Sequence, residues 1–207
     1  MADGGRGVKM CLAPLLPAMR LATSKLVLGG AYWTTYYQPD RIARVFSTLD
    51  HMTGGRAAWN VVTSLNDSEA LNFGLGQHPE HDLRYDMADE FMEVVLGHWD
   101  TWEDGSLILD KEGRFGDGSK VHRLDHKGEY YKSRGPFTVP RTPQGRPVLI
   151  QAGQSGRAKR FATSWGDLIF CAYKSVAMGQ VDYTGILAQL LRLGTGPASM
   201  RICPAVG

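Results

Sequence analysis

Three short stretches place polar side chains where they could bind an anion or a polar ligand. In "QAGQSGR" (151–157), Ser155 lies in a glycine-rich turn between an expected strand and an expected helix, where unpaired N–H groups and the positive end of the helix dipole converge. In "HPEHDLRYD" (78–86), His81 and Tyr85 are four residues apart and share one face at the start of a helix. In "WNVVTS" (59–64), Asn60 interrupts an apolar run.

Each stretch also has a purely structural interpretation. Ser155 can be the N-cap of its helix, which is the commoner role of a serine in that place. His81 can be a loop residue and Tyr85 a core residue, and for an isolated pair this interpretation is favoured. An unpaired Asn60 amide would be costly inside an apolar strand, so either a ligand or a neighbouring loop must satisfy it. Spacing alone leaves those two interpretations of Asn60 evenly balanced.

Other chemistries find little support in the sequence. The two common nucleotide motifs, G-x-G-x-x-G after a strand and G-x-x-x-x-G-K-[ST], are both missing. The "GQSG" around Ser155 resembles a hydrolase nucleophile elbow, but Arg157 stands where that motif needs glycine, so a serine nucleophile is not expected. Histidine pairs such as His122 and His126 lack a carboxylate or cysteine that completes a ligand set, so no metal site is expected.

Strands and helices that would position these residues alternate along the chain. Short, continuously apolar runs predict strands buried on both faces, and apolar residues at helical spacing predict amphipathic helices. Between them, residues 103–146 are rich in Gly, Asp, Lys and Pro, which predicts an insertion with a hairpin. The predicted strands lie within 25–33, 57–65, 147–153, 167–173 and 201–206, and the predicted helices within 38–55, 86–102, 156–166 and 183–194.

Alternating apolar strands and helices indicate an α/β fold with a parallel sheet, either doubly wound or a (β/α)8 barrel. The sequence supplies about five such strands in 207 residues, whereas a whole barrel needs eight strands and typically about 250 residues. A barrel would therefore be incomplete here. Asn60 lies toward the C-terminal half of its strand, the end at which such barrels build their active sites.

The composition, 43% hydrophobic and 21% charged, is that of a soluble globular protein with one domain. A net charge of +2 without charged blocks argues against nucleic-acid binding, and no apolar segment is long enough to span a membrane. Cys11, Cys171 and Cys203 are far apart and odd in number, which fits a reducing cytoplasm. Arg6 and Lys9 precede an apolar run that imitates a signal peptide, but prolines interrupt it and we assign it to the folded chain.

Four longer blocks of the sequence form a specific combination. They are "TTYYQPDRIARVFSTLDHMTGGRAAWNVVTS", "HPEHDLRYDMADEFMEVVLGHWDTWE", "KVHRLDHKGEYYKSRGPFTVPRTPQGRPVLIQAGQSGR" and "WGDLIF". With these blocks the chain resembles the nitrilotriacetate monooxygenase component A family from about residue 21 to residue 170. This is the branch of the bacterial-luciferase-like flavin monooxygenases that also contains dibenzothiophene-sulfone monooxygenase and a pristinamycin IIA synthase subunit.

The resemblance implies a (β/α)8 barrel that uses reduced FMN, supplied by a separate NAD(P)H:flavin reductase, and O2 to oxygenate a small organic substrate in a water-poor pocket. In the family, an Asp after the second strand, a Thr on the third, a His and a Tyr four apart and a Ser in the "QAG" turn hold FMN. The last three match His81, Tyr85 and Ser155, which implies phosphate binding.

Further positions follow from the same resemblance. Asn60 would face the flavin ring or the substrate. The family's Thr corresponds to Ala31, which removes a hydroxyl from the cofactor site, and Trp33 replaces a small Ser at the same rim. The resemblance identifies neither a catalytic acid or base in this chain nor its substrate.

Only about strands 3 to 7 of the barrel are expected within 1–207, which makes the chain a single luciferase-like barrel domain that is incomplete at both ends. It would be a fragment, the product of a truncated gene, or a half completed by a partner. The expected function is an FMN-dependent two-component monooxygenase, a homo-oligomer when complete. The alternative is a truncated, catalytically inactive remnant that still binds flavin.

Overall fold

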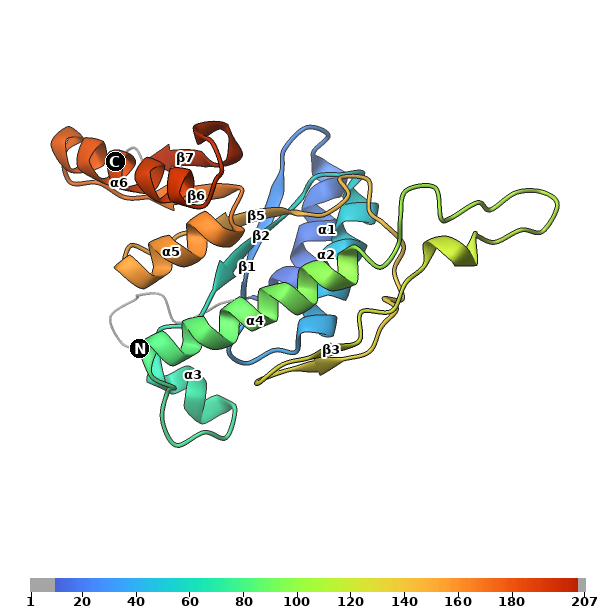
Figure 1. The fold of residues 1–207 in the computed structure, drawn as a ribbon, viewed down its shortest axis with the longest axis horizontal. Helices are drawn as coiled ribbons and strands as arrows, with labels where there is room; N and C mark the ends of the chain where they lie inside the picture. Colours follow the sequence, from blue (N-terminus) through green and yellow to red (C-terminus); the bar gives the residue numbers. More distant parts are fainter. Residues whose placement is uncertain (1–9, 205–207) are drawn as a thin grey trace.

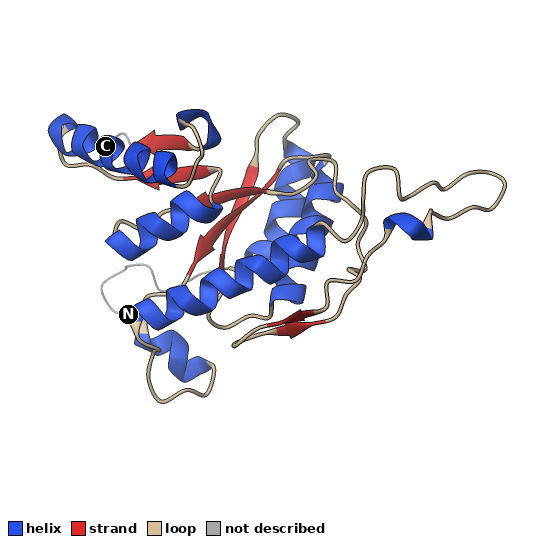
Figure 2. Ribbon diagram, viewed as in Figure 1, coloured by secondary structure: helices blue, strands red, loops and turns tan. Residues whose placement is uncertain are grey.

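A five-stranded parallel sheet forms the centre of the protein (Figures 1 and 2). The computed structural model describes residues 10–204 of the chain. The strand order is β1-β2-β5-β6-β7, and every neighbouring pair is parallel. The predicted α/β fold with a parallel sheet is therefore confirmed. The strands are β1 (Leu28–Trp33), β2 (Ala57–Val62), β5 (Val148–Gln151), β6 (Leu168–Cys171) and β7 (Arg201–Pro204).

Helices connect the strands and pack on the sheet and on one another. Helix α1 contacts β1, α2 contacts β2 and α5 contacts β5, while α4 lies between α2 and α5 (Figure 1). None of the described helices is both long and apolar enough to cross a membrane. The helices are α1 (Leu12–Ala22), α2 (Pro39–Thr53), α3 (Asp67–Asn72), α4 (His81–Trp99), α5 (Gly156–Trp165) and α6 (Val176–Arg192), with 3-10 turns at Gly118–Lys120 and Pro197–Ser199.

Local sequence signals fix the ends of these helices. Pro39 is the first residue of α2, where a missing N–H costs nothing, and Gly54 ends the helix in the left-handed conformation with φ of 66°. At α4, the Glu80 carboxylate caps the helix by accepting hydrogen bonds from the N–H groups of Asp82 and Leu83 at 2.8 and 3.1 Å. At α5, the Ser155 hydroxyl is the cap. The two helices that carry the predicted phosphate ligands thus start at well-defined residues.

The two faces of the sheet differ. Leu28, Gly30 and Tyr32 of β1 are buried toward the helices, whereas Gly29 and Ala31 are exposed. The expectation that β1 is buried on both faces is therefore wrong, because successive side chains point to opposite faces and the helices described here cover one of them. The "open face" of the sheet consists of Gly29, Ala31, Asn60, Ile150, Leu168 and Phe170, which are exposed or half-buried and share one side through the strand register.

Several predicted elements have other bounds. The helix predicted within 86–102 starts earlier, at His81, and ends at Trp99, so Trp102 is not part of it. Helices α1 and α3 were not predicted. The strand predicted within 201–206 is described as far as Pro204, and Arg6, Lys9 and residues 205–207 lie outside the described residues.

A small antiparallel hairpin, β3 (His126–Lys127) with β4 (Lys132–Ser133), is bound to α4 through Glu90. The Glu90 carboxylate accepts hydrogen bonds from the N–H groups of Tyr130 at 2.8 Å and Tyr131 at 2.7 Å, and it contacts His126 Nε2 at 3.1 Å. A Cβ at Gly128 would overlap this carboxylate, so the hairpin turn requires glycine. Glu90 is thus one of the side chains of α4 that hold the hairpin on the helix.

Replacing Glu90 with glutamine is expected to lower the free energy of unfolding at pH 7 by about 1–3 kcal/mol, because a charged acceptor of several buried hydrogen bonds is lost. Burial alone would raise the pKa of Glu90, but the hydrogen bonds from Tyr130, His126 and Tyr131 outweigh it and lower the pKa below its ordinary value of 4.5. Since the pKa is lower in the folded state, this stabilisation is present above the unfolded-state pKa and disappears as the pH falls through the folded-state pKa.

Urea unfolding between pH 7 and pH 3 measures this effect. The difference in stability between the native chain and Glu90→Gln should shrink as the pH falls. Glu93→Gln, on the exposed side of the same helix, is the matched control and should change little. A stability difference for Glu90→Gln that stays constant across this pH range would contradict the role of the ionised carboxylate.

Candidate functional site

The starts of helices α4 and α5 lie together, although they are far apart in the sequence. Ser155 Oγ is 3.4 Å from His81 Nε2 and also accepts the hydrogen bond from the Ala158 N–H at 3.1 Å. The other ring nitrogen of His81, Nδ1, is 2.7 Å from a carboxylate oxygen of Asp82. Asp82 therefore holds the imidazole with Nε2 toward Ser155.

Tyr85 lies one turn further along α4 and completes this group. Its ring centroid is 5.1 Å from that of His81, and its side chain is buried. The backbone at Gly153 passes close to the tyrosine, since a Cβ there would be 2.9 Å from the Tyr85 hydroxyl oxygen and would overlap the Cβ of Ala158. We call His81, Tyr85, Gly153 and Ser155 the cradle, because they surround the N-terminal end of α5.

An ion-pair cluster of one cation and two carboxylates lies beside the cradle. Arg157 Nη2 is 2.9 Å from Asp86 Oδ1 and 2.5 Å from Asp89 Oδ2, and its guanidinium lies 5.4 Å from the centroid of the Tyr85 ring. Burial alone would lower the pKa of Arg157, but the two carboxylates raise it overall. Because this cation is committed to Asp86 and Asp89, the donors that the cradle offers are hydroxyls, an imidazole and backbone N–H groups.

Such a set of donors at a helix N-terminus suits a phosphate group. The first N–H groups of α5 have no partner within the helix, and the helix dipole adds positive potential at the same place. Ser155, His81 and Tyr85 add side-chain donors around this point. The capping role of Ser155 and a ligand-binding role are compatible, since its hydroxyl oxygen accepts from Ala158 while its proton can be donated either to His81 Nε2 or to a ligand.

Asn60 and Ala31 lie apart from the cradle, on the open face of the sheet. Their Cα atoms are register partners on β2 and β1, and Asn60 also pairs with Ile150 of β5. The Asn60 Oδ1 atom is buried and has no hydrogen-bond partner within the described residues. The sequence-predicted site residues thus form two groups, three around the start of α5 and two that are neighbours on strands β1 and β2.

An aromatic cluster at the C-terminal end of β1 was not singled out from the sequence, apart from Trp33. The Trp33 ring stacks on Tyr37 with centroids 5.8 Å apart, and Tyr36 stacks on Phe73 at 4.7 Å. The Tyr36 hydroxyl also contacts His78 Nδ1. The run "YWTTYY" was the signal that could have revealed this cluster, but the partner Phe73 comes from the loop after α3 and requires the fold.

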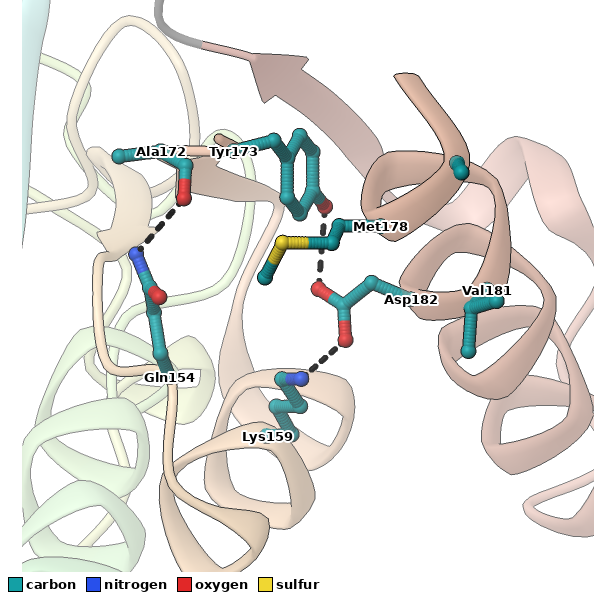
Figure 3. A pocket seen from close by; sticks show the side chains of 8 residues that line it. Gln154, Lys159, Ala172, Tyr173, Met178, Val181 and Asp182 are labelled. Atoms are coloured by element: carbon teal, nitrogen blue, oxygen red, sulfur yellow. Dashed lines mark hydrogen bonds and ion pairs between the residues drawn. The ribbon is translucent and has the colours of Figure 1, made fainter. Parts of the chain in front are cut away.

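A hollow lies between the starts of α5 and α6 (Figure 3). Its cavity volume is about 440 Å³, and its charged groups are paired, since Lys159 binds Asp182 and the Tyr173 hydroxyl donates to Asp182 at 3.0 Å. Gln154 joins this hollow to the turn that contains Ser155. Since Lys159 is neutralised, the hollow is less suited to an anion than the cradle. Its lining is Gln154, Lys159, Ala172, Tyr173, Ala177, Met178, Val181 and Asp182.

His122 and His126, which the sequence offered as a possible ligand pair, bind neighbouring carboxylates. His122 Nε2 is 2.5 Å from Glu103, and His126 binds Glu90 in the hairpin contact described above. Within residues 10–204, no three His, Cys, Asp or Glu side chains come together in a group that could hold a metal ion.

Comparison with known proteins identifies the family. The model of the luciferase-like monooxygenase family matches residues 10–206. The chain belongs to the luciferase-like monooxygenases. It is 48% identical to dibenzothiophene-sulfone monooxygenase from Rhodococcus erythropolis over 98% of this chain and 45% of that protein. It is 42% identical to nitrilotriacetate monooxygenase component A from Aminobacter aminovorans over 93% of this chain and 43% of that protein.

Solved structures share the fold of this chain. A riboflavin lyase, solved with modified FMN and riboflavin, superposes with a TM-score of 0.94 at 36% identity, over 99% of this chain and 46% of that one. DmoA from Hyphomicrobium sulfonivorans superposes with a TM-score of 0.92 at 40% identity, over 98% of this chain and 44% of that one. This luciferase-like chain spans less than half the length of each of these relatives.

Proposed function

We propose that this chain carries the flavin-phosphate site of an FMN-dependent two-component monooxygenase, which transfers one oxygen atom from O2 to a small organic substrate. The observation that carries the proposal is the contact between Ser155 and His81, which joins two helix N-termini into one anion site. Membership of the luciferase-like monooxygenases supports the same function, because the relatives from Rhodococcus erythropolis and Aminobacter aminovorans are both named as monooxygenases.

The described residues fit a flavin mononucleotide in two respects. Gly153 leaves the room beside Tyr85 that a Cβ would fill, which suits a phosphate at the start of α5. The buried Asn60 Oδ1 lacks a partner among the described residues and would accept an N–H group of the flavin ring or the substrate. In this proposal Ser155, His81 and Tyr85 bind the phosphate, and Ala31 leaves space on the open face where related enzymes have a threonine.

Reduced FMN, when bound, supplies the electrons that activate O2. The protein's share of the chemistry is binding and orientation. Ser155 and the first N–H groups of α5 donate hydrogen bonds to the phosphate, and Asp82 keeps the His81 ring directed at it. In a complete barrel, the apolar side chains of the open face would reduce the access of water to the reacting atoms.

We further propose that the five strands are about strands 3 to 7 of a (β/α)8 barrel within one domain, with residues 103–146 as an insertion. The parallel strand order and the greater length of the relatives support this. An NAD(P)H:flavin reductase would be the partner that supplies reduced FMN, the complete protein would be a cytoplasmic homo-oligomer, and the substrate would be a small organic molecule. The alternative is a flavin-binding remnant without catalytic activity.

Anaerobic titration with reduced FMN tests the proposed phosphate site. Saturable binding is expected, and both Ser155→Ala and His81→Ala should weaken it about 10-fold, the effect of losing one hydrogen bond to a charged group. Riboflavin, which lacks the phosphate, should bind more weakly and respond little to either substitution.

Ser175→Ala is the matched control, because Ser175 caps α6 as Ser155 caps α5. It should cost stability through the lost cap but leave FMN binding unchanged. A folded chain that does not bind reduced FMN would overturn the proposal. Binding without substrate oxidation, in the presence of a flavin reductase and O2, would favour the catalytically inactive alternative.

A further inference from the structure

A single carboxylate of α4 binds both ends of helix α5. Asp89 Oδ2 is 2.5 Å from Arg157 Nη2, and Asp89 Oδ1 accepts a hydrogen bond from the Trp165 indole N–H at 2.6 Å. Arg157 is the second residue of α5 and Trp165 is its last. Asp89 therefore binds side chains that come from opposite ends of α5, which restrains both the rotation of α5 about its axis and its position along α4.

The cradle depends on this relative position. His81 and Tyr85 come from the first two turns of α4, whereas Ser155 and the free N–H groups come from the start of α5. The contact between Ser155 and His81, at 3.4 Å, is already at the long end of hydrogen-bond distances. A small slide or rotation of α5 would therefore separate the donors that must act on one phosphate.

Arg157 transmits the contact and does not itself serve as a phosphate ligand. Its side chain is only 13% exposed, and Nη2 is shared between Asp86 and Asp89. Its guanidinium also lies near the Tyr85 ring, so it fixes a cradle residue directly. Asp86 is the less buried partner, with a side chain 56% exposed against 36% for Asp89, and of the two carboxylates it is Asp89 that also binds Trp165.

We propose that Asp89 is a positioning residue for the flavin phosphate, which acts through Arg157 and Trp165 to hold the starts of α4 and α5 at the spacing that the phosphate requires. The inference rests on the proposed function of the cradle. Loss of the Asp89 charge releases α5 at its N-terminal end, where the phosphate would bind. The binding of the rest of the flavin should not change. The phosphate-dependent part of flavin binding is therefore the property that Asp89 controls.

The test compares the affinities of reduced FMN and reduced riboflavin for the native chain and for Asp89→Asn, by anaerobic titration. In Asp89→Asn the affinity for FMN is expected to fall about 10-fold, less than the roughly 100-fold that a full 1 Å displacement of a binding group can cost, because Asp86 still binds Arg157. The affinity for riboflavin should stay the same. A general loss of structure would lower both affinities, so the ratio of the two separates positioning from stability.

Two further variants sharpen the result. Trp165→Phe keeps an aromatic side chain but lacks the indole N–H group that binds Asp89. It should also lower the ratio of the affinity for FMN to that for riboflavin. This variant replaces Asp89→Asn in the test if Asp89→Asn does not fold. Asp100→Asn is the matched control, because Asp100 ends the same helix and contacts Arg141 at 3.4 Å, far from the cradle. It should leave the ratio unchanged.

The outcomes are distinguishable. If the native chain binds FMN no more tightly than riboflavin, the proposed phosphate site fails, and the inference about Asp89 fails with it. If the native chain prefers FMN and folded Asp89→Asn or Trp165→Phe keeps the full preference, the phosphate site stands and the positioning role of Asp89 is refuted.

Discussion

Gly153→Ala is expected to reduce the affinity for reduced FMN by about 100-fold, because the substitution displaces groups on both sides of the cradle. The new Cβ would overlap the Cβ of Ala158 and lie 2.9 Å from both the Tyr85 hydroxyl oxygen and Gln151 Nε2. Tyr85 is only 5% exposed, so it has little room to move away. Either Tyr85 or the start of α5 must shift, and both are proposed phosphate ligands.

Gly156→Ala is the matched control for this prediction. Gly156 is three residues further along and begins α5, but a Cβ there would meet nothing within 4 Å. Its affinity for FMN should stay close to that of the native chain. The same anaerobic titration measures both variants, with circular dichroism to show that each is folded. Equal affinities for the two variants would contradict the tight packing of the cradle at Gly153.

Trp59→Ala is expected to lower the free energy of unfolding by about 3–5 kcal/mol, the usual cost of deleting a fully buried aromatic side chain. Trp59 is 0% exposed, with its ring centroid 5.4 Å from Phe46 of α2 and 6.1 Å from Phe91 of α4. Its indole N–H donates to the Tyr32 carbonyl at 3.1 Å, which ties β2 to β1. One substitution therefore weakens the contact of two helices with the sheet and removes one hydrogen bond between β2 and β1.

Equilibrium unfolding in urea measures this loss. Trp33→Ala is the comparison, because Trp33 lies on the open side of β1 and is only half-buried. It should cost clearly less than Trp59→Ala. Similar losses for the two tryptophans would contradict the assignment of the main core to the helix-covered side of the sheet.

Much of the fold follows from local sequence signals. The alternation of apolar runs with helical spacing predicts the parallel sheet, and Pro39 and Gly54 predict the ends of α2, because these signals act within a few residues. Helix α1 was not predicted from the sequence because Pro14 and Pro17 interrupt its apolar run. Pro14 lies in the first turn, where helix N–H groups need no partner, whereas Pro17 lies inside the helix and is offset by packing of α1 on β1.

The candidate site was predictable only in part. The four-residue spacing of His81 and Tyr85 and the glycine-rich turn around Ser155 pointed to anion binding, and the family resemblance joined them. Their proximity in space, with Ser155 and His81 3.4 Å apart, comes from the packing of α4 on α5. The roles of Asp89 and Gly153 depend entirely on that packing, so no local pattern reveals them.

The central pairing of the sheet, β2 with β5, also bears on how the chain folds. Helices α3 and α4 and the hairpin all lie between these two strands in the sequence. Closing so long a connection costs chain entropy before the strand hydrogen bonds compensate for it, and proteins dominated by such distant contacts fold slowly. This arrangement favours an order in which β1, α2 and β2 assemble locally, and β5 docks after α4 and its hairpin have shortened the connection.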